Sequence, residues 1–321
     1  MAETIFDQIR KTCQEVANRA GHVRINYDRI PAYASCLPVE QAVQPQLDPN
    51  CHYLGRQKDT VSFLLVLDSI NFGSGYFPHL NKSPGRSGYY TVAGCLNDHF
   101  RDSAPLSAHK LTQLTPADCI RIFRQDPQNR TIAELMRFFA RALNELGWYV
   151  QMDFGGSFTG LIEAAGASAE RLIQLLVRMP SFRDIHLYDT IKVPFYKRAQ
   201  LTAADLALAF KGQGPGRFDD LKHLTIFADN LVPHVLRVDN ILVYPDALTS
   251  HIDAGNLIPA GSAEEIEIRA CALHAAERLK DALSASGHAI TSMELDFLLW
   301  NRGQQPTYKS IPRHRTRTIF Y

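Results

Sequence analysis

The feature that most constrains the fold is a helical spacing of apolar side chains that recurs along the chain. It is clearest over residues 131–148, where one face carries Ile132, Leu135, Met136, Phe139, Leu143 and Leu146. Apolar residues three or four positions apart are typical of a helix that buries one stripe. Comparable patterns predict further helices, over residues 5–20, 116–123, 168–179, 194–210, 263–285 (expected to be the longest) and 295–300. With short strands expected near residues 23–27 and 240–244, the sequence predicts a mostly α fold with a few short β-strands.

Three segments are less regular. The prolines Pro31, Pro38, Pro45 and Pro49 punctuate a stretch that we interpret as connecting turns. Residues 60–72 form an apolar block that periodicity assigns to neither a buried strand nor a buried helix, and we favour the helix. Residues 88–92 fit either a strand or the start of a helix.

The size and composition of the chain are those of a globular protein with a substantial core. Its 321 residues are 45% hydrophobic and 21% charged, which argues against disorder. We find no repeat and no convincing linker, so we expect a single domain over residues 1–321. Residues 1–59 would be an N-terminal helix and a proline-punctuated connection that pack on it.

The charge balance limits the class of partner. Lys and Arg total 34 against 33 Asp and Glu, a net charge of +1, so the chain lacks the strongly basic face expected for binding a nucleic-acid backbone. The six cysteines are scattered singly, which suggests neither zinc nor a disulfide framework. With no signal peptide or membrane-spanning run, we expect a soluble cytoplasmic protein. We also expect it to need no metal or other cofactor.

A lone carboxylate marks the most unusual stretch, residues 224–234, where Asp229 interrupts an apolar run. Burying such a group is costly unless it is paired or hydrogen-bonded. Asp229 can serve as an N-cap for a helix through Val235 and Leu236. It can also be a catalytic carboxylate held at a pocket by that helix start, and the two roles do not exclude each other.

Polar groups in two other places have comparable alternatives. Asp68 and Asn71 lie one helical turn apart in the apolar block 60–72, where they can face a ligand or satisfy backbone groups at its end. The turn at residues 154–158, Phe-Gly-Gly-Ser-Phe, can cradle a phosphate at a helix start, although such a turn is more often only a turn.

The sequence lacks several catalytic signatures: the GxSxG elbow, the HExxH helix, the Walker loop and the GxGxxG fingerprint. What remains is a helix at 194–210 carrying Lys197, a glycine-rich hairpin at 212–216, and a second helix expected at 217–236 carrying Asp229. This arrangement suits chemistry at a sugar C1, where a carboxylate stabilises an oxocarbenium-like ribosyl cation and orients water.

Several blocks together resemble the queuosine salvage family of queuosine 5′-phosphate N-glycosylases/hydrolases. The resemblance extends from about Thr60 to Tyr321. Its blocks are residues 68–72 (DSINF), 87–89 (SGY), 154–158 (FGGSF), 195–200 (FYKRAQ), 227–229 (FAD), 265–270 (EIEIRA) and 311–321.

The resemblance implies a fold similar to the helix-hairpin-helix DNA glycosylases and hydrolysis of queuosine 5′-monophosphate, which releases queuine for salvage into tRNA. It also implies that Asp229 is the glycosylase aspartate and that Lys197 matches the lysine of some glycosylases. With Asp68 and Asn71, the substrate-binding candidates in these blocks are Phe72, Tyr89, Arg198, Phe227 and Tyr321.

The 5′-phosphate of such a substrate needs cationic or polar donors. The candidates are Lys197, His52, His314, Arg315 and Arg317. In the C-terminal tail, alternation places Arg313, Arg315 and Arg317 on one face of an extended segment. We expect this tail to pack on the body, with its arginines directed either to an anionic ligand or to the acidic start of the helix at 263–285.

Two functions remain in competition. The first is a metal-independent hydrolase that acts on a small-molecule nucleotide, expected to be a monomer without a stable nucleic-acid complex or membrane partner. The second is a non-catalytic helix-hairpin-helix module that binds a modified nucleotide or nucleic acid. Release of free base would distinguish them.

Overall fold

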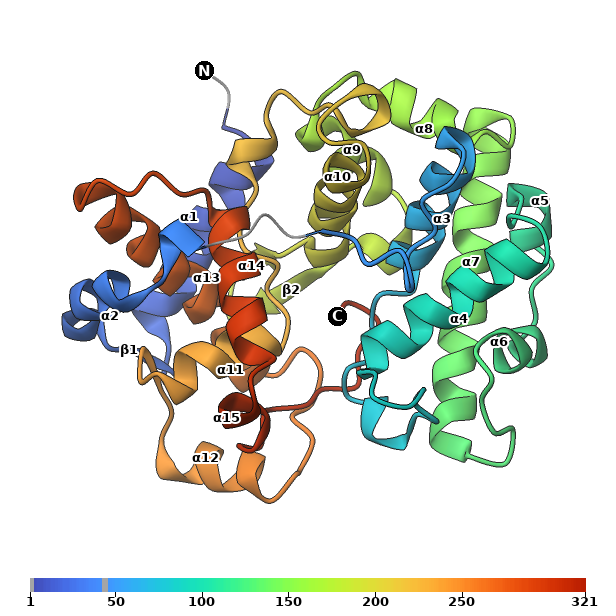
Figure 1. The fold of residues 1–321 in the computed structure, drawn as a ribbon. Coiled ribbons are helices and arrows are strands. Elements are labelled where there is room, and N and C mark those ends of the chain that lie inside the picture. The colour runs from blue at the N-terminus through green and yellow to red at the C-terminus, as the bar shows by residue number, and fades with distance from the viewer. Residues whose placement is uncertain (1–2, 42–45) are drawn as a thin grey trace. The chain divides into compact units, whose positions relative to one another are not determined.

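The computed structural model describes residues 3–41 and 46–321, and the chain is mostly α-helical with short antiparallel strands, as predicted (Figure 1). Its contacts divide it into two compact units. Unit 1 comprises residues 1–45, 184–197 and 222–317, and unit 2 comprises residues 46–183, 198–221 and 318–321. The expectation of one domain over residues 1–321 remains a prediction.

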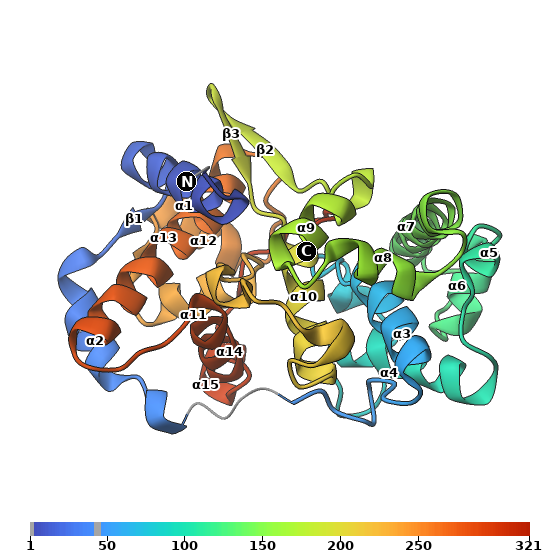
Figure 2. The ribbon, with the colours of Figure 1, turned by 90° about the horizontal axis from the view of Figure 1, so that it is seen from above.

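Unit 1 is built around a long helix, α13, which packs against α1 and α2, while α11 packs against α14. Segments from the two ends of the sequence thus share one core, and Figure 2 shows the blue α1 beside the orange α13. The helices of this unit are α1 (Ile5–Arg19), α2 (Ile30–Cys36), α11 (Leu231–Val238), α12 (Asp246–Asp253), α13 (Ala263–Ala285), α14 (Ser292–Gly303) and α15 (Pro306–Lys309).

The strands of unit 1 form two small antiparallel pairs. In the first, β1 (Arg24–Ile25) pairs with β4 (Leu242–Val243), with Arg24 opposite Val243. Both lie within the predicted strand segments. In the second, β2 (Ile185–Tyr188) and β3 (Ile191–Pro194) form a hairpin that the sequence analysis did not predict.

Unit 2 is organised around α7, which contacts α3, α5, α6 and α8. The apolar residues predicted to share a face of α7 are all buried. The helices of this unit are α3 (Gln57–Ser69), α4 (Gly88–Asp102), α5 (Ala108–Leu111), α6 (Pro116–Ile122), α7 (Arg130–Phe154), α8 (Phe158–Ala165), α9 (Ala169–Leu176) and α10 (Lys197–Ala209), whose first residue belongs to unit 1. Residues 57–69 and 88–102 are therefore helical, which settles two open alternatives.

Side-chain caps explain why many helices begin where they do. A side-chain oxygen at the N-cap accepts a main-chain N–H of the first turn, which would otherwise be unsatisfied. These caps are Thr4, Ser87, Ser107, Thr115, Asn129, Ser157, Ser168, Ser262 and Thr291. Short 3₁₀ turns connect other elements, at Tyr27–Arg29, Val39–Gln41, Phe77–His79, Pro180–Phe182, Gly214–Gly216 and Leu221–His223.

The predicted helix at 217–236 is wrong over its first half. Residues 224–228 are buried without regular structure, and α11 begins only at Leu231. The reason is that the main-chain N–H of Phe227 donates to the side chain of Asp296 rather than to a helical carbonyl. Asp229 then accepts the N–H groups of the following residues, so the helix starts after it.

Three other expectations need correction. The helix expected from Pro194 begins at Lys197, because Pro194 ends β3 and Tyr196 has a left-handed backbone with a φ of 47°. Pro31 does not lie in a connecting turn. It lies at the start of the helix α2, where the N–H that proline lacks would have no helical partner. Pro45 lies outside the described residues. Finally, α7, with 25 residues, is longer than α13, with 23.

The C-terminal tail is packed rather than free. His314, Thr316 and Thr318 are buried, while the alternate residues Arg313 and Arg315 are partly exposed, so the predicted alternation is present. Arg315 pairs with Leu257 in a parallel β-bridge within unit 1. In the described residues, no helix is both long and apolar enough to cross a bilayer, and the six cysteines are all unpaired thiols.

Candidate active site

Asp229 lies at the start of α11 and is partly exposed. Its Oδ1 accepts hydrogen bonds from the main-chain N–H of Leu231, at 2.7 Å, and of Val232, at 3.3 Å. The capping role predicted for Asp229 is therefore confirmed. Among the described residues no hydrogen bond reaches Oδ2, so the cap leaves one carboxylate oxygen available.

The residues around Asp229 are each tethered to a different element of unit 1. The N–H of Phe227 donates to Asp296 Oδ1 at 2.8 Å, and the carbonyl of Ala228 accepts from Arg269 Nε at 2.9 Å. On the other side, Asn230 Nδ2 donates to the carbonyl of His314 at 3.3 Å. These bonds fix the loop on both sides of the carboxylate, although the loop itself has no regular structure.

Asp296, on α14, is a second carboxylate beside this loop and is only 3% exposed. Burial raises the pKa of Asp296 well above its ordinary value. The nearby charge of Asp229 raises it further, and the Phe227 amide and the Lys197 charge oppose the shift. A carboxyl group whose pKa is raised keeps its proton to a higher pH than an ordinary aspartic acid, and in that form it can donate a hydrogen bond.

Lys197, the first residue of α10, belongs to the same electrostatic neighbourhood because its charge acts on Asp296. The residue is 6% exposed, and its main-chain N–H donates to Asp184 Oδ2 at 3.3 Å. The structure thus brings the two predicted catalytic residues, Lys197 and Asp229, into one unit around a carboxylate that the sequence analysis did not select. Phe227, a predicted binding residue, lies in the loop just before Asp229. Its ring packs edge-to-face on that of Phe297, with 5.8 Å between the ring centroids.

Two residues of the C-terminal tail in unit 1, His314 and Arg313, have pKa values shifted by burial. Burial, together with the nearby charges of His234 and Arg313, lowers the pKa of His314 from 6.5 to about 3. His314 is therefore neutral at pH 7, which weakens the prediction that it meets a phosphate as a cation. Burial also lowers the pKa of Arg313, and the nearby charge of Asp229 opposes this shift.

Unit 2 holds the other predicted site residues except Arg315 and Arg317, which belong to the part of the tail in unit 1. His52 Nε2 lies 2.9 Å from the hydroxyl of Tyr89, and His52 Nδ1 lies 3.0 Å from the carbonyl of Asp48. Burial raises the pKa of Tyr89 well above its ordinary value, and the charges of Asp205 and Asp68 add to the shift. His52, Tyr89 and Asp68 thus form one polar neighbourhood, together with Asp205 of α10.

Asp68 and Asn71 lie at the C-terminal end of α3, where Asp68 is fully buried and Asn71 is half-buried. The main-chain N–H of Asn71 donates to the carbonyl of Asp68 at 3.4 Å. Arg198 also meets this helix end, since its guanidinium donates to the carbonyls of Asp68 and Ser69 and to that of Ser181. A cation is stabilised at a helix C-terminus, and this geometry favours a structural role for Arg198.

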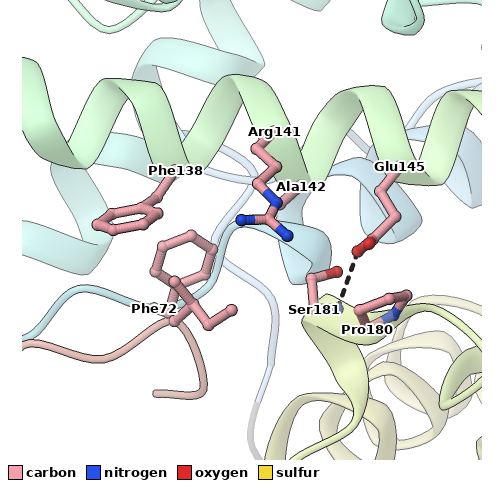
Figure 3. Close-up of a pocket in the computed structure, with 8 residues that line it drawn as sticks. Phe72, Phe138, Arg141, Ala142, Glu145, Pro180 and Ser181 are labelled. Atoms are coloured by element: carbon pink, nitrogen blue, oxygen red, sulfur yellow. Dashed lines mark hydrogen bonds between the residues drawn. The ribbon is translucent and has the colours of Figure 1, made fainter.

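Phe72 and the C-terminus lie near one another in unit 2. The carbonyl of Tyr321 accepts from the N–H of Gly73 at 3.0 Å, and Phe72 packs edge-to-face on Phe139 at 5.2 Å. Figure 3 shows Phe72 beside a cavity of about 30 Å³, lined by Phe72, Phe138, Arg141, Ala142, Glu145, Pro180, Ser181 and Ile319. This volume suits a water molecule rather than a nucleotide, so we do not place the substrate there.

Comparison with known proteins agrees with the resemblance identified from the sequence. The family model described as queuosine salvage protein matches residues 51–321. The chain belongs to the queuosine salvage protein family.

Relatives carry matching names. A protein of Sphaerobacter thermophilus named queuosine 5′-phosphate N-glycosylase/hydrolase is 36% identical over 97% of this chain and 96% of its own length. Proteins of the same name from Mus musculus and Dictyostelium discoideum are 29% and 33% identical. These two alignments cover 97% and 82% of this chain, and 98% and 78% of the relatives.

The family match includes every predicted site residue, from His52 to Tyr321. Asp296 and Asp205 were not predicted from the sequence, and Arg313 was named only as one of the alternating arginines of the tail. Asp296 carried a usable signal, because it interrupts the apolar run Leu295–Trp300 just as Asp229 interrupts its own. Asp205 and Arg313 carried no such signal in the sequence, because a single acidic residue in a helix and a single arginine in a basic tail are common.

Proposed function

We propose that this chain hydrolyses the N-glycosidic bond of queuosine 5′-monophosphate and so releases queuine for salvage into tRNA. The observation that carries the proposal is the similarity, over nearly the whole chain, to relatives named for this reaction. The geometry around Asp229 supports it, because a fixed and partly exposed carboxylate is what cleavage at a sugar C1 requires.

Asp229 is the proposed catalytic residue. Its Oδ1 is held by two amides of α11, so Oδ2 can face the sugar and stabilise the oxocarbenium-like charge as the bond to the base breaks. The same carboxylate can orient the attacking water. Buried neighbours such as Ile226 and Phe227 lower the local polarity and strengthen this interaction.

Lys197 is the second proposed catalytic residue, and its role follows from the charges around it. Two carboxyl groups, Asp229 and Asp296, lie in one electrostatic neighbourhood. The lysine supplies a positive charge there, which opposes the rise in the pKa of Asp296. The same ammonium is a candidate for the 5′-phosphate.

The substrate constrains the other residues. Queuine is a 7-deazaguanine and offers no N7 for protonation, so the leaving base must be assisted at another edge. Asp68 and Asn71 are our candidates for contacts with the base, and Phe72, Tyr89, Phe227 and Tyr321 for apolar contacts. Arg315, Arg317 and His52 are the further candidates for the 5′-phosphate. A cytoplasmic monomer belongs to the same proposal, and the unpaired cysteines support its cytoplasmic part.

Replacement of Asp229 by Asn tests the mechanism. Asn retains an oxygen that can cap α11 but lacks the negative charge, so we expect an unchanged fold and roughly a hundredfold or greater loss of kcat. Release of queuine from the mononucleotide is measured by mass spectrometry, and melting curves verify the fold. The matched control is Asp253→Asn, which removes a surface carboxylate of the same unit and should leave kcat unchanged.

The same measurement separates the two candidate functions. Free base in the wild-type mixture supports a hydrolase, whereas an unchanged nucleotide bound at one equivalent would support a binding module instead. Normal turnover by the Asp229→Asn variant, with wild-type release intact, would reject the carboxylate mechanism and leave the hydrolase standing.

A further inference from the structure

Arg269 is a fully buried arginine in the middle of α13. Burial of a charge is costly unless the charge is paired and its donors are satisfied. Its Nη1 and Nη2 donate to Asp184 Oδ1 and Oδ2, at 3.0 and 2.6 Å, in a two-pronged ion pair. Its guanidinium also stacks on Phe195, with 3.9 Å between the guanidinium carbon and the ring centroid.

The third nitrogen of Arg269 reaches the predicted catalytic loop. Nε donates to the main-chain carbonyl of Ala228 at 2.9 Å, and Ala228 directly precedes Asp229. Because the guanidinium is planar, the bond to Ala228 and the two bonds to Asp184 are oriented together. One side chain therefore fixes the loop carbonyl relative to Asp184.

Asp184 in turn holds the turn that leads to Lys197. Its main-chain carbonyl accepts the N–H of Phe195 at 2.9 Å, and its Oδ2 accepts the N–H of Lys197 at 3.3 Å. Between them, Tyr196 has a φ of 47°, a conformation uncommon for a residue other than glycine. Such a conformation persists where its surroundings hold it, and Asp184 supplies bonds on both sides.

We infer that Arg269 and Asp184 form a brace that sets the position of Asp229 relative to Lys197. Neither residue of the brace is assigned contact with the substrate, so both are positioning residues. The inference rests on the proposed function for its catalytic consequence. The structural part of the inference does not depend on the proposed function. It states that residues 195–197 and 227–229 are connected through one buried ion pair.

A lysine at position 269 tests this inference while it retains the charge. A single ammonium cannot reproduce the fork to Asp184 together with the bond to Ala228. We expect Arg269→Lys to lower kcat for queuosine 5′-monophosphate about 10- to 100-fold with a less than about threefold change in KM, because misplacement of reacting groups affects the chemical step. Arg302→Lys is the matched control, since Arg302 pairs with Asp239 in the same unit and should retain kcat.

Hydrogen–deuterium exchange provides a measurement that does not depend on activity. In Arg269→Lys, peptides covering residues 195–197 and 227–232 should exchange several times faster than in the wild type, and in Arg302→Lys they should not. An Arg269→Ala variant adds a rescue experiment, in which millimolar guanidinium should restore part of kcat and of the protection.

The outcomes separate the two proposals. Unchanged exchange in both segments would overturn the brace, whatever the activity. Faster exchange with an unchanged kcat would overturn the role of the brace in positioning the catalytic residues. Equal losses of kcat in the Arg269 and Arg302 variants would show that Arg269 only stabilises the fold, as Arg302 does. If the wild type releases no base, the proposed function fails, and exchange still decides whether the brace exists.

Discussion

The loop before α11 has a buried carboxylate on either side, and the two are accommodated in different ways. On one side Asp184 is 2% exposed and lies 2.6 Å from a guanidinium nitrogen of Arg269. Burial opposes its ionisation, but the charge of Arg269 and hydrogen bonds from His186 and Arg269 outweigh burial. The pKa of Asp184 therefore lies well below its ordinary value.

On the other side Asp296 is 3% exposed, and the carboxylate Asp229 is among its nearby charges. Among the described residues its hydrogen-bond donor is the main-chain N–H of Phe227, and the charge of Lys197 lowers its pKa only slightly. Burial and like charge together raise its pKa. Equal burial thus accompanies a lowered pKa in one place and a raised pKa in the other, because the nearest charge decides the direction of the shift.

The largest expected effect comes from breaking the Asp184 pair. Asp184→Asn leaves Arg269 buried without its counter-charge, so we expect the free energy of unfolding to fall by about 3–5 kcal/mol at pH 7. Urea denaturation measures it. Since the folded pKa of Asp184 is depressed, this stabilisation is complete above its ordinary value of 3.8 and lost as the pH falls further. A fall of less than about 1 kcal/mol in the free energy of unfolding at pH 7 would show that the Asp184–Arg269 pair contributes little to stability.

An intermediate effect extends the comparison to a buried base. His314 has no acid among the recorded influences on it, and its pKa falls from 6.5 to about 3. The unfolded chain binds a proton below pH 6.5 and the folded chain does not, so stability falls with pH in this range. At pH 5 this costs about 2 kcal/mol relative to pH 8. His314→Gln should show a correspondingly smaller fall between pH 8 and pH 5, and an identical fall would contradict the neutral state.

The smallest effect is expected for Asp296→Asn. A protonated carboxyl and an amide are similar in shape, and the amide oxygen can still accept from Phe227, so the change in stability at pH 5 should be within about 1 kcal/mol. The wild type holds this proton more tightly when folded, so its stability declines as pH rises above 3.8. The variant should therefore gain on the wild type between pH 5 and pH 8 in thermal melts. A loss that grows with pH would mean that Asp296 is ionised.

The helices were largely predictable because their signals are local. The apolar stripe of α7 and the caps at Thr115 and Thr291 lie within a few residues of the structure they determine. The hairpin of β2 and β3 was missed, since the pattern of residues 185–194 is short and part of it is exposed. The start of α11 was misplaced because the bond that interrupts it comes from Asp296, 69 residues away.

For the candidate site, the sequence by itself determined that Asp229 is unusual, since a single acid in an apolar run has few explanations. The pattern also placed Lys197 within the helix expected at 194–210, and the resemblance to the family made it a catalytic candidate. The direction in which the pKa of Asp184 and of Asp296 shifts follows only from how the chain packs. Asp184 and Arg269 are 85 residues apart along the chain, yet their atoms lie within 3 Å. Electrostatic energy depends on separation in space and on burial, and both are set by how the helices pack.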